Sequence, residues 1–143
     1  MSDSLDPASH PWMTATETRA VLDALAAGAE PAGAVARFVG GCVRDALAGA
    51  DGADVDIATP LPPEEVMTRL EAAGLRAVPT GIDHGTVTAV ANHRGFEITT
   101  LRRDVETDGR RAVVAYTTDW REDAERRDFT MNALFAEPDG SLH

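Results

Sequence analysis

Two aspartates separated by one residue, Asp54 and Asp56, are the side chains in this chain best suited to hold a metal ion. Ala53, Val55 and Ile57 alternate with them, which predicts a strand whose apolar side chains face a core and whose carboxylates face the other way. Carboxylates this close repel each other and raise one pKa unless a divalent cation neutralises them. A solvated strand face would show the same pattern, so both interpretations stay open.

A third carboxylate, Glu97, lies in the alternating segment Phe96-Glu97-Ile98 and is expected to point away from the core of a neighbouring strand. Three acids on one face of a sheet, next to a turn that can bind anions, indicate metal ions held against a polyphosphate. Each feature is ambiguous by itself, and their combination favours a metal site.

The turn in question is Gly40-Gly41, between a predicted strand and a predicted helix. Glycines at such a junction let backbone amides approach a ligand, and the helix N-terminus adds unpaired N–H groups. Arg44, one turn into the helix, could reach the same anion. A Gly-Gly pair also commonly serves only to separate two elements. Cys42 is interpreted as a small buried packing residue, because no histidine lies near it in the sequence.

An arginine-rich cluster occupies the segment Arg126-Arg127-Asp128-Phe129-Thr130-Met131-Asn132. Arginine and asparagine side chains suit phosphates, ribose hydroxyls and base edges, which makes the cluster a candidate nucleotide contact. A charged helix end followed by a core segment would have the same sequence.

The elements that must position these side chains are predicted from periodicity and turn residues. A first helix opens with a capping box at Thr14 and Glu17 and ends near Gly28. Further helices are expected over residues 42–48, 62–73 and 119–127, and strands over residues 34–39, 53–59, 75–78, 86–91, 96–101 and 112–116. Strands 86–91 and 96–101 form a predicted hairpin, and residues 104–111 are expected to form a charged loop.

The charge balance argues against a protein that binds nucleic acid over its whole surface. The formal net charge is −11, with 24 acidic and 13 basic residues. All the cations are arginine, and eight of the 13 lie between Arg94 and Arg127, around the candidate motifs. Arginine is well suited to forked contacts with phosphate, so the basic residues fit a local anion site.

The 143 residues fit one domain. The single cysteine excludes an intramolecular disulfide, and no stretch approaches the about 20 apolar residues that span a membrane. We therefore expect a soluble, cytoplasmic protein. Residues 1–13 are expected to be a poorly ordered tail and residues 14–143 to form the domain. The apolar segment 129–136 precedes a turn near the end of the chain, which indicates a fragment of something longer.

Taken in order, these motifs resemble the head domain of class II tRNA nucleotidyltransferases (CCA-adding enzymes) and bacterial poly(A) polymerases. The matching pieces are Gly40-Gly41-x-x-Arg44-Asp45, Asp54-x-Asp56-Ile57-Ala58-Thr59, Glu97, and Arg126-Arg127-Asp128-Phe129-Thr130-x-Asn132. Their order and spacing match from about Arg37 to the end of the chain.

The resemblance implies a role for each matching residue. Asp54 and Asp56 would hold two Mg²⁺ ions, and Glu97 would position or activate the 3′-hydroxyl of an RNA primer. The nucleotide would be held by residues from both ends of the chain: Gly40, Gly41, Arg44, Arg126, Arg127, Asp128 and Asn132. Arg103 and Asp104 would open the family's flexible loop, and Asp45 would brace the glycine turn.

The resemblance also implies an α+β, polymerase-β-like fold: a mixed, mostly antiparallel sheet flanked by helices. Its implied function is addition of CCA to tRNA 3′ ends from CTP and ATP. Poly(A) addition and a metal-nucleotide binding module without turnover are the alternatives. The neck, body and tail regions of the family are absent from this chain, which leaves nucleotide selectivity open. The charged loop at 104–111 resembles that of enzymes able to add the terminal A.

Overall fold

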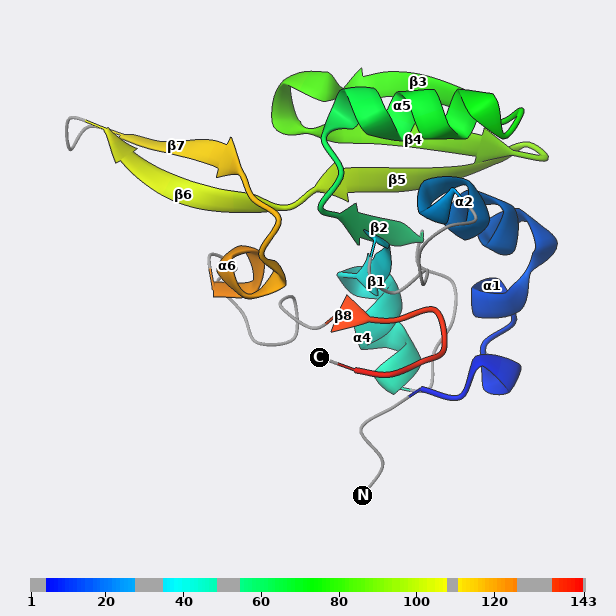
Figure 1. Cartoon of the computed structure of the whole chain (residues 1–143). Coiled ribbons are helices and arrows are strands. Elements are labelled where there is room, and N and C mark those ends of the chain that lie inside the picture. Colours follow the sequence, from blue (N-terminus) through cyan, green and yellow to red (C-terminus); the bar gives the residue numbers. More distant parts are fainter. Residues whose placement is uncertain (1–4, 28–34, 49–54, 108–110, 126–134, 143) are drawn as a thin grey trace.

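The computed structural model describes residues 5–27, 35–48, 55–107, 111–125 and 135–142. Figure 1 shows a twisted sheet with helices packed against it and a two-stranded arm extending away. The helices are η1 Pro7–Ser9, α1 Pro11–Thr14, α2 Thr16–Ala26, α4 Gly41–Leu47, α5 Pro63–Ala72, η2 Ile82–His84 and α6 Trp120–Glu125. The strands are β1 Arg37–Val39, β2 Asp56–Thr59, β3 Arg76–Gly81, β4 Thr86–Ala91, β5 Arg94–Thr100, β6 Arg102–Thr107, β7 Arg111–Tyr116 and β8 Phe135–Ala136.

The main sheet has six described strands in the order β3-β4-β5-β2-β1-β8. Strands β2 and β5 pair in parallel, and every other neighbouring pair in this sheet is antiparallel. The predicted α+β class, with a mixed and mostly antiparallel sheet flanked by helices, is confirmed. The parallel pair matters most for function, because it joins the strands that contain Asp56 and Glu97.

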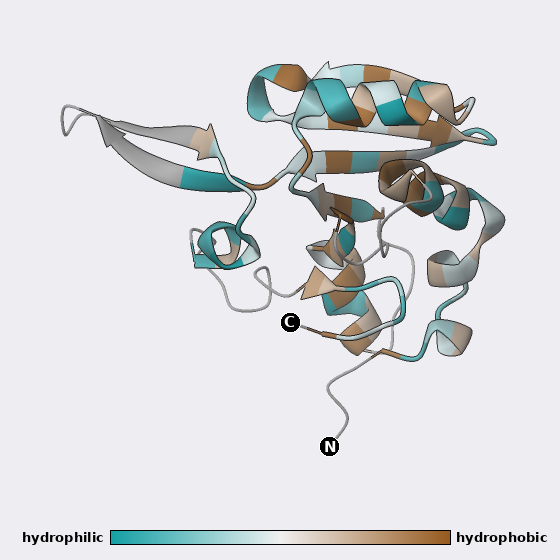
Figure 2. Ribbon diagram, viewed as in Figure 1, coloured by the Kyte–Doolittle hydropathy of each residue, from teal (hydrophilic) through white to brown (hydrophobic). Residues whose placement is uncertain are grey.

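Helices α2 and α5 cover one face of the sheet (Figure 1). Helix α5 begins with Pro63 and has Glu64 and Glu65 in its first turn, where a proline and acidic side chains are favoured. Its buried face includes Val66 and Leu70, one turn apart. Figure 2 shows apolar residues at intervals along α2, α5, β4 and β5, and the buried ones belong to one core cluster. No helix in the described ranges is long and apolar enough to cross a membrane.

The core of this layer consists of side chains from alternate positions along the strands. The largest fully buried ones from β1, β2 and β5 are Phe38, Ile57, Phe96 and Ile98. Val39 of β1 and Ala58 of β2 face the other side, where they form a second, smaller cluster with Leu101 and with Phe135 of β8. Trp120 of α6 packs against this cluster. In the described part of the chain, the sheet thus has one face covered by α2 and α5 and an opposite face on which α6 packs.

The predicted hairpin is confirmed as β4 and β5. Asn92 and His93 at its turn have φ angles of 49° and 68°, the left-handed conformations that a tight two-residue turn requires. The register pairs Thr88 with Glu97 and Ala91 with Arg94. The turn type therefore determines which side chain of β4 lies directly beside Glu97.

The predicted charged loop at residues 104–111 is wrong for its described part, because Asp104 to Thr107 belong to β6. Strands β6 and β7 form an antiparallel hairpin that extends from the body as the arm in Figure 1. The predicted strand 112–116 lies within β7. Residues 108–110 of the loop prediction lie outside the described residues.

Residues 1–13 were expected to be a poorly ordered tail, but residues 5–13 pack against the core. Met13 has no exposed surface, and Leu5 is 7% exposed. The Trp12 ring packs edge-on against Phe38, with 4.9 Å between ring centroids. These residues therefore close one side of the core.

The capping box predicted at Thr14 and Glu17 is also wrong. Helix α2 begins at Thr16, and its N-cap residue Ala15 has no side chain that could accept a hydrogen bond. Glu17 instead accepts a hydrogen bond from Asn92 Nδ2 at 3.1 Å, which is the first cause that lowers the pKa of Glu17. Glu17 therefore ties α2 to the β4–β5 turn.

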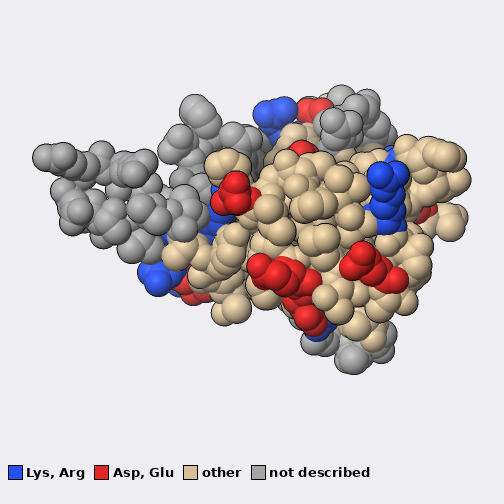
Figure 3. All heavy atoms as spheres, turned by 90° about the horizontal axis from the view of Figure 1, so that it is seen from above, with Lys and Arg blue, Asp and Glu red and all other residues tan. Residues whose placement is uncertain are grey.

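The charges of the described residues are dispersed on the side of the molecule seen in Figure 3, where acidic and basic side chains form small separate groups among neutral ones. On this side, the described residues form no broad basic surface. Such a distribution of charge is compatible with a local anion site.

Candidate functional site

Two predicted site carboxylates, Asp56 and Glu97, lie side by side. They are directly paired in the register of the parallel strands β2 and β5. Ile57 and Ile98, the next pair, are buried in the helix-covered core, so Asp56 and Glu97 lie on the opposite face. Asp56 is partly buried and Glu97 is exposed. This part of the prediction, two acids from different strands on one face, agrees with the structure.

The predicted anion turn lies on the other side of Asp56. Gly40 is the N-cap residue of α4, with φ 77° and ψ −140°, a conformation that favours glycine. A Cβ atom at Gly40 would lie 3.5 Å from Asp56 Oδ2. The glycine turn thus lies close to this carboxylate, and a side chain at Gly40 would come into van der Waals contact with it.

Arg44 lies one turn into α4, and its backbone N–H donates to the Gly40 carbonyl at 3.1 Å. Its side chain is 53% exposed and its Nε lies 3.6 Å from the Asp45 carboxylate. An exposed ion pair of this kind is weak, so the guanidinium can exchange Asp45 for another anion at little cost.

Cys42 faces the interior rather than the site. Its thiol lies 3.3 Å from the Val39 carbonyl and is 3% exposed as a residue. Burial raises the pKa of the Cys42 thiol, which keeps it in the protonated, unreactive form. The packing interpretation of this cysteine agrees with the structure.

Five of the predicted site residues lie outside the described residues: Asp54, Arg126, Arg127, Asp128 and Asn132. Their assignments remain predictions. Within the described residues there is no group of three or more acids, histidines or cysteines that could hold a metal ion. Asp56 and Glu97 thus provide two carboxylates of the expected three.

Helix α6 borders the acidic face at the far end of β1. The Arg37 guanidinium lies 4.2 Å from the centroid of the Trp120 ring, and removal from water lowers the pKa of Arg37. The buried Asp123 accepts a hydrogen bond from the Arg102 backbone N–H at 2.9 Å. These contacts hold α6 against the sheet, on the side of the sheet where Asp56 lies.

The sequence prediction missed the neighbours of Glu97 on β4 and β3. Thr88 lies directly beside Glu97, and its hydroxyl is 2.7 Å from that of Thr80. The alternation of Thr86, Thr88 and Val90 with buried residues was the available signal for this face. Only the register of the hairpin shows that Thr88 is the one next to the acid.

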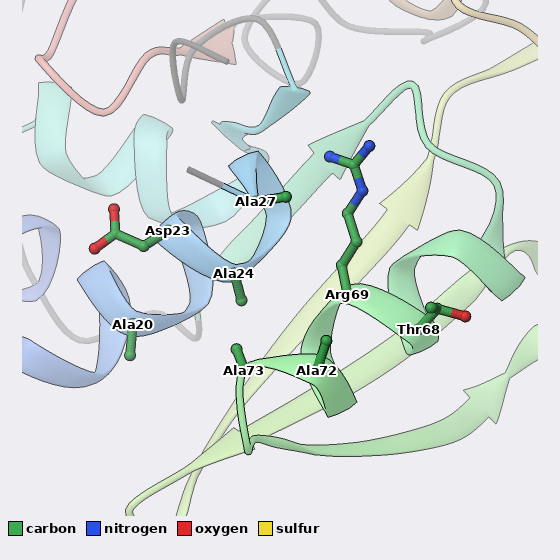
Figure 4. Close-up of a pocket in the computed structure, with 8 residues that line it drawn as sticks. All are labelled: Ala20, Asp23, Ala24, Ala27, Thr68, Arg69, Ala72 and Ala73. Carbon is green, nitrogen blue, oxygen red and sulfur yellow. The ribbon is translucent and has the colours of Figure 1, made fainter. Parts of the chain in front are cut away.

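A cavity of about 530 Å³ lies elsewhere, between α2 and α5 (Figure 4). Alanines line most of it, and its one cationic group, Arg69, donates to the Leu25 carbonyl at 2.6 Å and to Glu65 at 3.1 Å. The helices that form it pack on the sheet face opposite Asp56. This cavity therefore is not part of the acidic site.

The family profile described as "Poly A polymerase head domain" matches residues 36–142. Among curated proteins, the chain is 51% identical over 108 residues to the mitochondrial CCA tRNA nucleotidyltransferase 1 of Danio rerio, which covers 75% of this chain and 25% of that protein. Among solved structures, the Bacillus stearothermophilus CCA-adding enzyme in complex with CTP has a TM-score of 0.70 at 35% identity, covering 89% of this chain and 28% of that one.

A tRNA nucleotidyltransferase complexed with a primer tRNA and an incoming ATP analogue also matches, with a TM-score of 0.56 at 28% identity, over 76% of this chain and 30% of that one. The chain thus spans about a quarter of the length of the curated relative from Danio rerio.

Proposed function

The chain belongs to the family described as the poly(A) polymerase head domain, and we propose that it is the catalytic head of a nucleotidyltransferase that adds CCA to the 3′ end of tRNA. The observation that supports this proposal best is the pairing of Asp56 with Glu97 across β2 and β5, next to the Gly40 turn. The two relatives with the highest identity reported above are named CCA tRNA nucleotidyltransferase and CCA-adding enzyme, and the second was solved with CTP.

The carboxylates fit a divalent metal. Oxygen ligands from aspartate and glutamate are those that Mg²⁺ prefers, and Asp56 Oδ2 lies close to the Gly40 turn. We propose that Asp54 and Asp56 hold two Mg²⁺ ions. Bound there, the ions would lower the pKa of an attacking hydroxyl and neutralise charge on a triphosphate.

The other site residues would bind the primer and the incoming nucleotide, each according to its position around Asp56. Glu97, on the far side of Asp56 from the glycine turn, would orient the primer 3′-hydroxyl as a hydrogen-bond acceptor. Backbone N–H groups at Gly40 and Gly41, with the Arg44 guanidinium, would bind the triphosphate. The proposed contacts to the sugar and base of the nucleotide come from Arg126, Arg127, Asp128 and Asn132.

In the proposed reaction the primer 3′-oxygen forms a bond to the α-phosphorus of CTP or ATP. The bond from that phosphorus to the bridging oxygen breaks, pyrophosphate leaves in line with the attack, and the hydroxyl proton passes to solvent or to Glu97. Positioning of the two substrates and stabilisation of charge in the transition state would accelerate this reaction, so the site needs no nucleophilic side chain. The buried, protonated state of Cys42 agrees with that requirement.

Poly(A) addition is the second candidate, because the matching family is itself described by poly(A) polymerase. A metal-nucleotide binding module without turnover is the third, because the chain covers about a quarter of the relative from Danio rerio. We propose that the head domain expected over residues 14–143 also includes the packed residues 5–13, and that its compartment is the cytoplasm. Since that relative is named mitochondrial, fractionation of cells that express the tagged chain tests the compartment.

The deciding experiment incubates the chain with Mg²⁺, labelled CTP or ATP, and tRNA that lacks CCA. We expect CTP to be incorporated first and ATP only after it. Long tracts of A without CTP would identify a poly(A) polymerase. Binding of the nucleotide without any incorporation at high protein concentration would identify the binding module.

Asp56→Asn and Glu97→Gln should each lower incorporation by about 100-fold or more, the usual cost of removing one group that stabilises transition-state charge. The matched control is Asp83→Asn, which neutralises an exposed aspartate in η2. Asp56→Asn should also abolish the rise in melting temperature caused by Mg²⁺ with CTP. Full activity in both site variants would show that Asp56 and Glu97 are not catalytic residues.

A further inference from the structure

The acidic face continues past Glu97 onto β4 and β3 with neutral polar side chains. Thr88 lies directly beside Glu97, and Val78 lies beside Thr88 on the next strand. The Thr88 hydroxyl is 2.7 Å from that of Thr80, and either can be the donor. Two hydroxyls have two protons and their mutual bond uses one, so the pair keeps a donor and several lone pairs for another partner.

The next set of paired residues on the same face contains a glycine without a side chain and, further along, an arginine. Gly95, exposed and without a side chain, lies opposite Val90, and Val90 lies opposite Arg76 on the edge strand β3. A Cβ atom at Gly95 would meet only the Thr88 methyl, at 3.5 Å. The surface beside Glu97 is therefore low at Gly95 and ends at the exposed guanidinium-bearing residue Arg76.

The order of the strands gives this face a direction. The Gly40 turn lies on the β1 side of Asp56, and Glu97 lies on its β5 side, next to β4. In an in-line displacement the attacking oxygen and the leaving group lie on opposite sides of the phosphorus. If the triphosphate lies at the Gly40 turn, the attacking hydroxyl must come from the β5 side.

We propose that the last nucleotides of the RNA primer cross the sheet from Glu97 over β4 to β3, where Thr88 contacts the terminal ribose or phosphate and Arg76 pairs with a phosphate further upstream. This inference rests on the proposed function, since it locates the RNA substrate of that reaction. The chemistry of the face fits a single strand: hydroxyls for ribose and phosphate, a bare backbone for close approach, and one cation for a phosphate.

Photocrosslinking tests the path without requiring turnover. Short single-stranded RNAs with 4-thiouridine one, two or three nucleotides from a free 3′-hydroxyl are bound to the wild-type chain with Mg²⁺ and a non-hydrolysable CTP analogue, irradiated and digested with trypsin. Cleavage after arginine places Gly95–Thr100 of β5 in peptide 95–102, and β4 with most of β3 and with Arg94 in peptide 77–94. We expect crosslinks to move from 95–102 into 77–94 as the label moves upstream. Crosslinks that avoid residues 77–94 at all three positions would overturn the path.

Three variants test the individual contacts by RNA affinity. Thr88→Val keeps the shape of the side chain and removes its hydroxyl, so the Kd for RNA should rise about threefold to tenfold. Arg76→Gln should weaken binding and lower the slope of log K against log salt by about 0.7, the value for one phosphate on a single strand. Gly95→Val should fold, because the site has room for a Cβ, and should obstruct RNA.

The control is Thr86→Val. Thr86 lies on the same strand and face as Thr88, and its hydroxyl is 3.1 Å from that of Thr99. Thr99 pairs with Ala58 rather than with Asp56, so this hydroxyl pair lies away from the acids. It should leave RNA affinity unchanged, and all four variants should keep the wild-type KM for CTP. Equal losses in Thr86→Val and Thr88→Val would contradict the assigned contact. If CTP is incorporated but the crosslinks lie outside residues 77–94, the proposed RNA path is wrong and the proposed function stands. If crosslinks form in residues 77–94 without incorporation, the path is supported and the proposed turnover is contradicted.

Discussion

Asp56 is the residue at which three separate parts of the chain meet. Val39 of β1 pairs with it on one side, Glu97 of β5 pairs with it on the other, and a Cβ atom at Gly40 would lie 3.5 Å from its Oδ2. Any side chain at Gly40 would approach Asp56 Oδ2 and would also have to adopt a φ of 77°, which costs about 1–2 kcal/mol for other residues. Glycine at this position thus keeps a side chain away from the carboxylate, on the side where a phosphate ligand is proposed.

Cys42 provides a prediction about pH at the same scale. Burial raises the pKa of its thiol above the ordinary value of 9.0. As pH rises, the thiol loses its proton at a lower pH in the unfolded chain than in the folded one. The stability that the neutral thiol contributes is therefore complete below pH 9.0, and it is lost as the pH rises from 9.0 to the raised pKa. We expect the unfolding free energy of the wild type to fall above pH 9.0, by at most about 1.4 kcal/mol per pH unit.

Cys42→Ala isolates this effect. The variant should be less stable at neutral pH because it leaves a small cavity, and the gap to the wild type should narrow above pH 9.0. The chain has no lysine, so few other groups titrate in this range. Urea unfolding at several pH values measures the gap, and parallel curves for the two proteins would show that the thiol is not buried as described.

At the scale of elements, the base of the β6–β7 arm is fixed by one close contact. Gly85 precedes β4 with φ 78°, and a Cβ atom there would lie 2.8 Å from the Tyr116 ring. Tyr116, at the end of β7, is 46% exposed, and Thr117 donates its backbone N–H to the Leu101 carbonyl at 2.9 Å. Tyr116 therefore packs the arm against the body at Gly85.

Gly85→Ala should cost more stability than Gly74→Ala. Both glycines have similar φ angles, 78° and 80°, but nothing lies within 4 Å of a Cβ at Gly74. The two variants therefore share the backbone strain, and only Gly85→Ala must displace Tyr116. We expect a difference of about 1 kcal/mol or more, as for other overpacked sites, measured by thermal or urea unfolding. Adding Tyr116→Ala should remove the difference; if it persists in the double variant, the ring is not its cause.

The same scale shows which elements the sequence could predict. Helix α5 and the β4–β5 hairpin were predicted well, because proline, acids and regular apolar spacing define their ends and faces. Residues 104–107 of β6 were predicted as part of a loop, because the segment that begins at Arg103 and Asp104 has no apolar alternation, and the only described strand partner of β6 is β7. The capping box failed because Thr14 belongs to α1, a helix too short for a periodic signal.

The candidate site was predictable only in part. Alternation in the sequence correctly assigned Asp56 and Glu97 to the face away from the core. It could not show that they are direct neighbours, because the register of a parallel pair depends on contacts distant in sequence. For the same reason Thr88 was missed. Asp54 and Arg127 remain predictions from the family resemblance, since they lie outside the described residues.

For the whole molecule, the N-terminal residues belong to the fold. Leu5 donates its backbone N–H to the Gly140 carbonyl at 2.7 Å, and an Arg19 nitrogen lies 3.4 Å from the Pro138 carbonyl. Figure 1 shows the N-terminal helices next to the turn after β8. The first and last described segments thus pack together on one side of the core.

Met13→Ala should therefore cost about 2–5 kcal/mol of unfolding free energy, as expected for a fully buried side chain. Thr14→Ala, at the exposed neighbouring position, should change it by less than about 0.5 kcal/mol. Urea unfolding measures both. Equal, small effects would mean that residues 5–13 are a dispensable tail after all.

The parallel pairing of β2 with β5 also has a consequence for the order of events during folding. Strand β5 can pair with its sequence neighbour β4 early, through a tight turn. Its pairing with β2 must wait until the intervening α5, β3 and β4 have been placed, because loop closure over a long segment is entropically costly. A refolding chain should therefore recover its hairpin before it brings Asp56 beside Glu97, so affinity for metal and nucleotide should return last.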